Sequence, residues 1–204
     1  MEIIEIKGLT LQRNNRQLFG GLSATITKGS ISAIVGPNGC GKSSLLLAIT
    51  GDLKPSIGSI FIAEKNLQEL SDLEQSRLRS MALQERTFWH PMTVREVLAL
   101  GQSDEAVNQI EKIAANLGLT ELLDNLVTTL SVGQVQRIEI ARTLLRDCLI
   151  YLFDEPFAAQ DIASKEKLIE IFKQLRSAGK TVILVAHSEV EKLSWCDQII
   201  QLGS

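Results

Sequence analysis

A glycine-rich pattern at residues 36–43 restricts the fold of this 204-residue chain more than any other feature. It reads GPNGCGKS and fits the phosphate-binding pattern G-x-x-x-x-G-K-[ST]. The nearly all-apolar residues 31–35 before it predict a buried parallel strand, and residues 43–50 after it predict a helix that Gly51 ends. A strand, a glycine-rich turn and a helix begin a βαβ unit, so the pattern predicts an α/β fold.

This segment also has the chemistry to bind nucleotide phosphates. Its glycines let backbone N–H groups point inward around phosphate oxygens, and the helix that follows adds the positive end of its dipole. Lys42 supplies a positive charge for the β- and γ-phosphates, and the Ser43 hydroxyl suits Mg²⁺. We therefore expect ATP and Mg²⁺ as cofactors. The expected nucleotide-binding residues of this segment are Gly36, Pro37, Asn38, Gly39, Cys40, Gly41, Lys42, Ser43 and Ser44.

Two carboxylates follow a second apolar segment. Residues 148–153 read CLIYLF, which predicts a buried strand, and Asp154 and Glu155 come directly after it. Because ligands of parallel α/β folds bind at the carboxyl ends of the strands, we expect Asp154 to hold Mg²⁺, directly or through water. Glu155 is then placed to polarise the attacking water as a general base. The alternative interpretation is a solvated acidic turn after a strand.

A second helix start suited to phosphate lies at residues 130–134, which read LSVGQ. It opens an amphipathic helix that the spacing predicts over residues 134–146. One domain needs only one helix start to bind the phosphates of one nucleotide. The second helix start is explained if two copies of the chain meet face to face. Together with the two patterns above, this segment makes the chain resemble an ABC ATPase subunit over nearly its whole length.

The resemblance implies a homodimer in which two ATP molecules lie between the subunits. LSVGQ resembles the family signature LSGGQ, with Val132 in place of the first glycine. Ser131, Gly133 and Gln134 are then implied to contact the γ-phosphate that the loop of the opposite subunit holds. Val132 adds a side chain beside this contact. Because both half-sites carry the full set of motifs, two working sites are expected.

Three more positions match the family pattern one by one. Gln84 resembles the Q-loop glutamine, which is implied to reach Mg²⁺ and the attacking water, and His187 resembles the switch histidine, which touches the γ-phosphate. Asp161 matches the end of the D-loop, which usually reads S-A-L-D, whereas the residues before Asp161 differ from that pattern. The implied catalytic residues are Glu155, His187, Gln84 and Lys42, and the implied metal ligands are Ser43, Gln84 and Asp154.

The expected adenine contact departs from the family pattern. The family usually places an aromatic residue on the first hairpin upstream of the phosphate loop, and by register Arg13 or Asn14 stands there. A guanidinium plane can stack on adenine in a cation–π contact worth ~0.5–2 kcal/mol, so Arg13 is the expected adenine-binding residue. The alternative is a solvent-exposed Arg13 and weak discrimination between bases.

The fold class that follows is α/β, with a P-loop NTPase (RecA-like) core, an N-terminal antiparallel β subdomain and an inserted α-helical subdomain. Residues 2–7 and 22–27 alternate apolar and polar side chains, which predicts two antiparallel edge strands. Residues 104–117 predict an amphipathic helix with Ser103 as its N-cap. The expected division of this single domain is residues 1–84 and 141–204 for the core with its β hairpin, and residues 85–140 for the helical subdomain with the signature.

Composition and charge argue against several other functions. The net charge is −3 and no long basic run is present, so the composition does not support binding to nucleic acid; a local basic patch is the alternative that stays open. Three scattered cysteines are too few for a disulfide framework or a zinc site. No apolar run approaches the ~20 residues that span a bilayer, and the first residues lack the features of a signal peptide. Any membrane role therefore needs a partner.

The resemblance implies the ATP-hydrolysing subunit of a transporter, bound peripherally at the cytoplasmic face of the cell membrane. The chain has one ATPase domain and no coiled-coil arm, which disfavours ABC proteins that act on DNA or ribosomes. Phe88 and Trp89, close to Gln84, predict the groove for the coupling helix of a permease subunit; packing inside the helical subdomain is the alternative. Residues 36–43, 91–101 and 195–197 resemble bacterial importers of iron chelates, haem or cobalamin, which also implies an extracytoplasmic solute-binding protein.

Two alternatives stay open. Residues 16–23 and the short chain resemble the small ATPases of haem-handling exporters in cytochrome c maturation. Val132 and the missing adenine aromatic instead motivate a non-transport regulatory ABC module that binds ATP and barely turns it over, whereas Glu155 and His187 argue for turnover.

Overall fold

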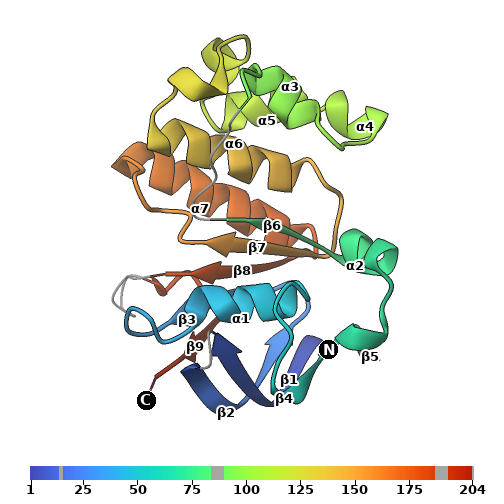
Figure 1. Ribbon diagram of the computed structural model, residues 1–204. Helices are drawn as coiled ribbons and strands as arrows, with labels where there is room; N and C mark the ends of the chain where they lie inside the picture. Colours follow the sequence, from blue (N-terminus) through green and yellow to red (C-terminus); the bar gives the residue numbers. More distant parts are fainter. Residues whose placement is uncertain (14–15, 84–89, 187–192, 204) are drawn as a thin grey trace.

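Two β-sheets and several helices stack in layers in the computed structural model, which describes residues 1–13, 16–83, 90–186 and 193–203 (Figure 1). The larger sheet is parallel and has the strand order β6-β7-β8-β3-β9. Its strands are β3 (Ile31–Val35), β6 (Arg79–Ala82), β7 (Ile150–Asp154), β8 (Thr181–Val185) and β9 (Gln198–Gln201). Every residue of β3, β7 and β8 is buried, as expected for central strands covered on both faces.

The smaller sheet is antiparallel and has the order β2-β1-β4-β5. Its strands are β1 (Glu2–Arg13), β2 (Arg16–Thr27), β4 (Ile57–Ile62) and β5 (Lys65–Asn66). The two predicted N-terminal strands are antiparallel and longer than the alternation indicated. The prediction that both are edge strands is wrong for β1, because β1 pairs with β2 on one side and with β4 on the other. Helix α1 (Lys42–Ile49) lies between the two sheets, so its apolar side chains are buried from both sides (Figure 1).

The opposite face of the parallel sheet carries the helical layers. Helices α6 (Val132–Leu144) and α7 (Ile162–Ser177) cover the sheet, and α3 (Val94–Ala99), α4 (Asp104–Val107) and α5 (Ile110–Asn116) lie beyond α6 (Figure 1). The remaining helix, α2 (Asp72–Leu78), directly precedes β6 and contacts it. Three 3₁₀ turns complete the described elements: η1 (Leu67–Glu69), η2 (Thr120–Leu122) and η3 (Val127–Thr129).

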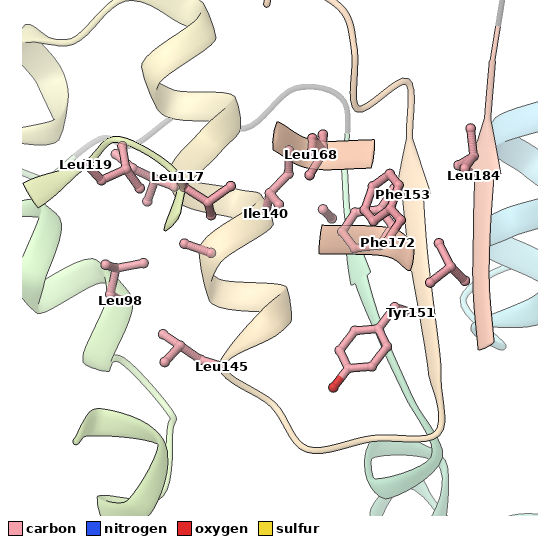
Figure 2. Close-up of a cluster of buried hydrophobic side chains, with 14 of the residues drawn as sticks. Leu98, Leu117, Leu119, Ile140, Leu145, Tyr151, Phe153, Leu168, Phe172 and Leu184 are labelled. Atoms are coloured by element: carbon pink, nitrogen blue, oxygen red, sulfur yellow. The ribbon is translucent and has the colours of Figure 1, made fainter. Parts of the chain in front are cut away.

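Two hydrophobic cores form because successive side chains of a strand point to opposite faces. On β7, Ile150 and Leu152 join the core around α1, whereas Tyr151 and Phe153 join the core under the helices. Figure 2 shows this second core, in which leucines of the helical layer lie on one side of α6 and the aromatic side chains lie on the other. The rings of Phe153 and Phe172 have centroids 4.7 Å apart and fasten α7 to the sheet.

One prediction from periodicity is wrong. The helix expected over residues 104–117 is two helices, because α4 ends at Val107 and α5 begins at Ile110. Ser103 caps the first of them as predicted, since its side chain accepts a hydrogen bond from Ala106 N. The division into a core and a helical subdomain stays a prediction, and α6 continues without a break across residues 140 and 141. Within the described part of the chain, no helix has the length and apolar composition to cross a membrane.

Candidate functional site

The loop between β3 and α1 is shaped by two glycines that no other residue could replace without rearrangement. Gly36 has φ 154°, and a Cβ atom there would lie 2.5 Å from the carbonyl oxygen of Leu202. Gly41 is the N-cap of α1 with φ 104°, and a Cβ atom there would lie 2.9 Å from the Phe19 ring. Both positions combine a positive φ with a close neighbour, so the loop can wrap tightly around the helix start.

Lys42 directs its ammonium group into this loop. The residue is 5% exposed, and its Nζ donates hydrogen bonds to Gly36 O at 2.9 Å and to Pro37 O at 3.0 Å. A positive charge is thereby held at the helix N-terminus, next to backbone N–H groups that favour anions. Phosphate oxygens that entered the loop would meet both.

The predicted magnesium ligands of α1 and β7 lie in contact. Ser43 Oγ donates a hydrogen bond to Asp154 Oδ1 at 3.0 Å, and Asp154 is 7% exposed at the carboxyl end of β7. A hydroxyl and one carboxylate fit Mg²⁺, which keeps several waters and binds through one or two carboxylates plus substrate phosphates. The described residues contain no cluster of three or more acidic, histidine or cysteine side chains that could hold a metal by themselves.

A pocket of about 500 Å³ opens around this loop. Its lining residues are Arg13, Leu18, Asn38, Gly39, Gly41, Lys42, Ser43, Ser44 and Glu155. The sheet edge therefore brings together residues that the sequence assigned to phosphate, to adenine and to general-base catalysis. Arg13 lines the pocket and is exposed to solvent, so its guanidinium is accessible to a ligand that enters the pocket.

Leu18 is a lining residue that sequence reasoning missed. The sequence did hold a signal for Leu18, because this residue follows Arg13 on the first hairpin. In the structure, the Leu18 Cβ lies 3.1 Å from the position that a Cβ at Gly41 would take. Cys40, by contrast, does not line the pocket among the described residues; its Sγ lies 2.9 Å from the position of a Cβ at Gly36, on the side of the loop that faces Leu202.

Glu155 occupies a strained backbone position directly after β7. Its φ is 50°, in the left-handed region that costs a non-glycine residue of order 1–2 kcal/mol. Its carbonyl oxygen accepts hydrogen bonds from Ala158 N at 3.0 Å and from Gln136 Nε2 at 2.8 Å. Strain of this kind persists only where the surroundings hold it, and it is concentrated at functional sites.

The segment 130–134 forms the start of α6 through a capping box. Ser131 Oγ accepts a hydrogen bond from Gln134 N at 3.3 Å, and Gln134 Oε1 accepts one from Ser131 N at 2.8 Å. Gly133 packs so closely that a Cβ atom there would lie 2.5 Å from Ala159 O. Val132, which replaces the first glycine of the signature, is 73% exposed, so its side chain meets no such obstacle within the subunit.

Ser131, Gly133 and Gln134 are not among the described residues that line the pocket of their own subunit.

Asp161 caps α7: its Oδ1 accepts a hydrogen bond from Ser164 N at 2.8 Å and its Oδ2 accepts one from Ser164 Oγ at 2.8 Å. These two bonds lower the pKa of the Asp161 carboxyl below its ordinary value, and the bond from the Ser164 backbone has the larger effect. The four remaining predicted positions, Gln84, Phe88, Trp89 and His187, lie outside the described residues.

Comparison with known sequences gives a family match over most of the chain. The family described as ABC transporter matches residues 19–158. The ribose import ATP-binding protein RbsA of Caldanaerobacter subterraneus subsp. tengcongensis is 32% identical over 98% of this chain, and this chain spans 42% of its length. The hemin import ATP-binding protein HmuV of Nocardia farcinica is 30% identical over 98% of this chain, which spans 74% of that protein.

Solved structures share the fold. A nucleotide-free ATP-binding cassette from an ABC transporter has a TM-score of 0.85 at 24% identity, with 100% of this chain and 90% of that chain covered. The ATP-binding subunit of another ABC transporter has a TM-score of 0.88 at 22% identity, with 98% and 85% covered.

Proposed function

Because this chain belongs to the ABC transporter family of ATP-binding cassettes, which are ATPases that power transport, we propose that it hydrolyses ATP to drive an importer. The observation that carries the proposal is the pocket that Lys42, Ser43 and Glu155 line, with Asp154 hydrogen-bonded to Ser43. A charged loop, a cation site and a carboxylate on one pocket wall are the parts that phosphoryl transfer to water requires.

In the proposed reaction, the loop binds the ATP phosphates through backbone N–H groups and Lys42. Mg²⁺, held by Ser43 and Asp154, would neutralise the charge that develops on the phosphoryl oxygens. Glu155 accepts a proton from the attacking water, while Lys42 stabilises the negative charge of the transition state. Arg13 covers the adenine ring. Gln84 and His187 are proposed to orient the water and to contact the γ-phosphate.

The working unit is proposed to be a homodimer. Ser131, Gly133 and Gln134 of each copy would contact the γ-phosphate held in the other copy, so bound ATP joins the two subunits. The position of these residues outside the pocket of their own subunit supports this arrangement. Hydrolysis removes the γ-phosphate contact and lets the dimer open, which is the motion that a transporter can use.

A second pocket supports the proposed permease partner. It has a volume of about 450 Å³ and lies between the core and the helical layer, with walls from α2, β6 and the end of α6. Ser80 and Met81 of β6 line it, and the chain continues from β6 toward Gln84, Phe88 and Trp89. We propose that the coupling helix of a transmembrane permease docks here, which would place the chain peripherally on the cytoplasmic face of the membrane.

For the solute we propose a metal chelate or a related compound, delivered by an extracytoplasmic solute-binding protein. The similarity to hemin import proteins supports this choice. The similarity to a ribose import protein supports only the broader proposal of an importer.

The test is affinity purification of the tagged chain from its native membranes. We expect a polytopic permease and a solute-binding protein to co-purify. Ser76→Trp, which fills the second pocket, should lose the permease, whereas Ser177→Trp should keep it; both serines are exposed on helices and bond back to a carbonyl of the preceding turn. A small exporter subunit, or a soluble complex without membrane proteins, would contradict the importer.

A further inference from the structure

Three side-chain hydrogen bonds connect the start of α6 to the turn that carries Glu155. Gln160 Nε2 donates to Gly133 O at 3.1 Å and to Gln136 Oε1 at 2.9 Å. Gln136 Nε2 in turn donates to Glu155 O at 2.8 Å. The chain of bonds therefore runs from residue 133 through two glutamines to the backbone of the carboxylate residue on the pocket wall.

Gln136 is suited to this position because its amide both accepts and donates. The residue is 6% exposed, and its oxygen and one of its nitrogen donors are both used within the network. A buried amide satisfied on both sides fixes its own orientation and resists displacement. An apolar side chain of the same length could fill the space but could make neither bond.

The turn that these bonds hold is conformationally strained. Glu155 and Ala159 have φ values of 50° and 54°, both in the region that side chains other than glycine disfavour. Ala158 N and Gln136 Nε2 share the Glu155 carbonyl oxygen, so losing the glutamine removes one of the hydrogen bonds that hold the first of these residues. The close approach of Gly133 to Ala159 O clamps the other end of the turn.

Position 160 supports a role specific to this chain. The D-loop pattern that the chain resembles has leucine before its aspartate, and leucine could make neither of the bonds that Gln160 makes. The neighbouring Asp161 is hydrogen-bonded to Ser164 and caps α7, whereas Gln160 is hydrogen-bonded to Gly133 and Gln136 of α6.

We propose that Gln136 and Gln160 are positioning residues for ATP hydrolysis: they keep the backbone of Glu155 in the conformation that aims its carboxylate into the pocket. They also connect this turn to residues 131–134, so a partner's nucleotide that displaces those residues changes the position of Glu155. The proposal rests on the proposed role of Glu155 as general base.

The experiment compares steady-state ATPase kinetics and equilibrium ATP affinity of the full chain with Gln136→Met, Gln160→Leu, both changes together, and Gln174→Met as a matched control. Gln174 is an exposed glutamine of α7. We expect each network variant to lower kcat by about 10-fold, while KM and ATP affinity change by less than about 2-fold, because a misplaced base slows chemistry without removing a phosphate contact. The double variant should be no slower than the slower single variant, since the two residues act through one chain of bonds.

The proposal is overturned if both single variants keep the kcat of Gln174→Met, if their effects multiply, or if only KM changes. If the Gln136→Met protein does not melt cooperatively, it is not folded, and the kinetics of Gln160→Leu, at a half-buried position, then test the proposal. Glu155→Gln distinguishes failure of the positioning role of Gln136 and Gln160 from failure of the general-base role of Glu155. If that change abolishes turnover while the network variants turn over normally, only the positioning role fails; if it leaves turnover intact, the role of Glu155 itself fails.

Discussion

Ser43 Oγ and Asp154 Oδ1 lie 3.0 Å apart, although 111 positions separate the two residues in the sequence. The contact joins the first turn of α1 to the carboxyl end of β7. It brings the Ser43 hydroxyl, on the wall of the proposed nucleotide pocket, into contact with a buried carboxylate, and a cation held by these two groups would also touch the phosphates.

Asp154→Asn should keep this hydrogen bond and lose the charge that binds Mg²⁺. We expect kcat to fall by about 100-fold or more, because the metal supplies several kcal/mol of transition-state stabilisation. A Mg²⁺ titration of ATPase activity measures the effect. Asp147→Asn is the control, since the Asp147 side chain is 91% exposed near the other end of β7. Equal magnesium dependence in both variants would contradict the assignment.

Arg13→Ala should weaken ATP binding by removing the guanidinium from the pocket wall. A cation–π contact of ~0.5–2 kcal/mol corresponds to a rise in KM of about 2- to 30-fold, with kcat little changed. Arg16→Ala serves as the control, because Arg16 is exposed and pairs with Arg13 across the hairpin. If the two variants have the same KM for ATP, Arg13 does not contact adenine.

Gly133→Ala should destabilise the protein, because the added methyl group would lie 2.5 Å from the Ala159 carbonyl oxygen. We expect the free energy of unfolding to fall by about 1–3 kcal/mol, the usual effect of overpacking. Val132→Ala, one residue earlier and 73% exposed in the parent, should stay within about 0.5 kcal/mol of it. Urea denaturation of both variants tests this, and equal stabilities would count against the close contact.

Asp161 gives the stability a specific pH dependence. Its hydrogen bonds with Ser164, the backbone one first, lower the folded-state pKa, so the ionised cap stabilises α7 above the unfolded-state value of about 3.9 and the gain is lost as the pH falls through the folded pKa. Asp161→Asn keeps a capping side chain but does not titrate. The wild type should therefore gain stability relative to this variant as the pH rises toward about 4, and a difference that is constant with pH would be evidence against the cap.

The elements nearest the chemistry could be predicted from local sequence. The apolar segment 31–35 is β3 with the predicted bounds, and the predicted strand 148–153 is observed as β7 over Ile150–Asp154, so Asp154 is its last residue and does not follow it. Both predictions depend on an apolar run of a few residues. The predicted helix start at residue 134 was two residues late, because the cap lies inside the signature and not after it.

Features that depend on distant partners could not be predicted. Periodicity alone did not reveal the break between α4 and α5, because the apolar spacing continues across residues 108 and 109. Strand β4 begins with exposed residues and a glycine, so its pairing with β1 leaves little trace in its own sequence. The bonds from Gln160 to residues on α6 cross more than 20 positions and depend on side-chain geometry alone.

The most direct test of the account is the mass of Glu155→Gln in solution with nucleotide. This variant should bind ATP without hydrolysing it, so sedimentation velocity with saturating ATP and Mg²⁺ should show the 22.4 kDa chain converted to a species of twice that mass, and ADP should leave it monomeric. Glu121→Gln, at an exposed position, should not accumulate the dimer. A Glu155→Gln protein that stays monomeric with saturating ATP and Mg²⁺ would contradict the proposal that ATP joins two copies of this chain.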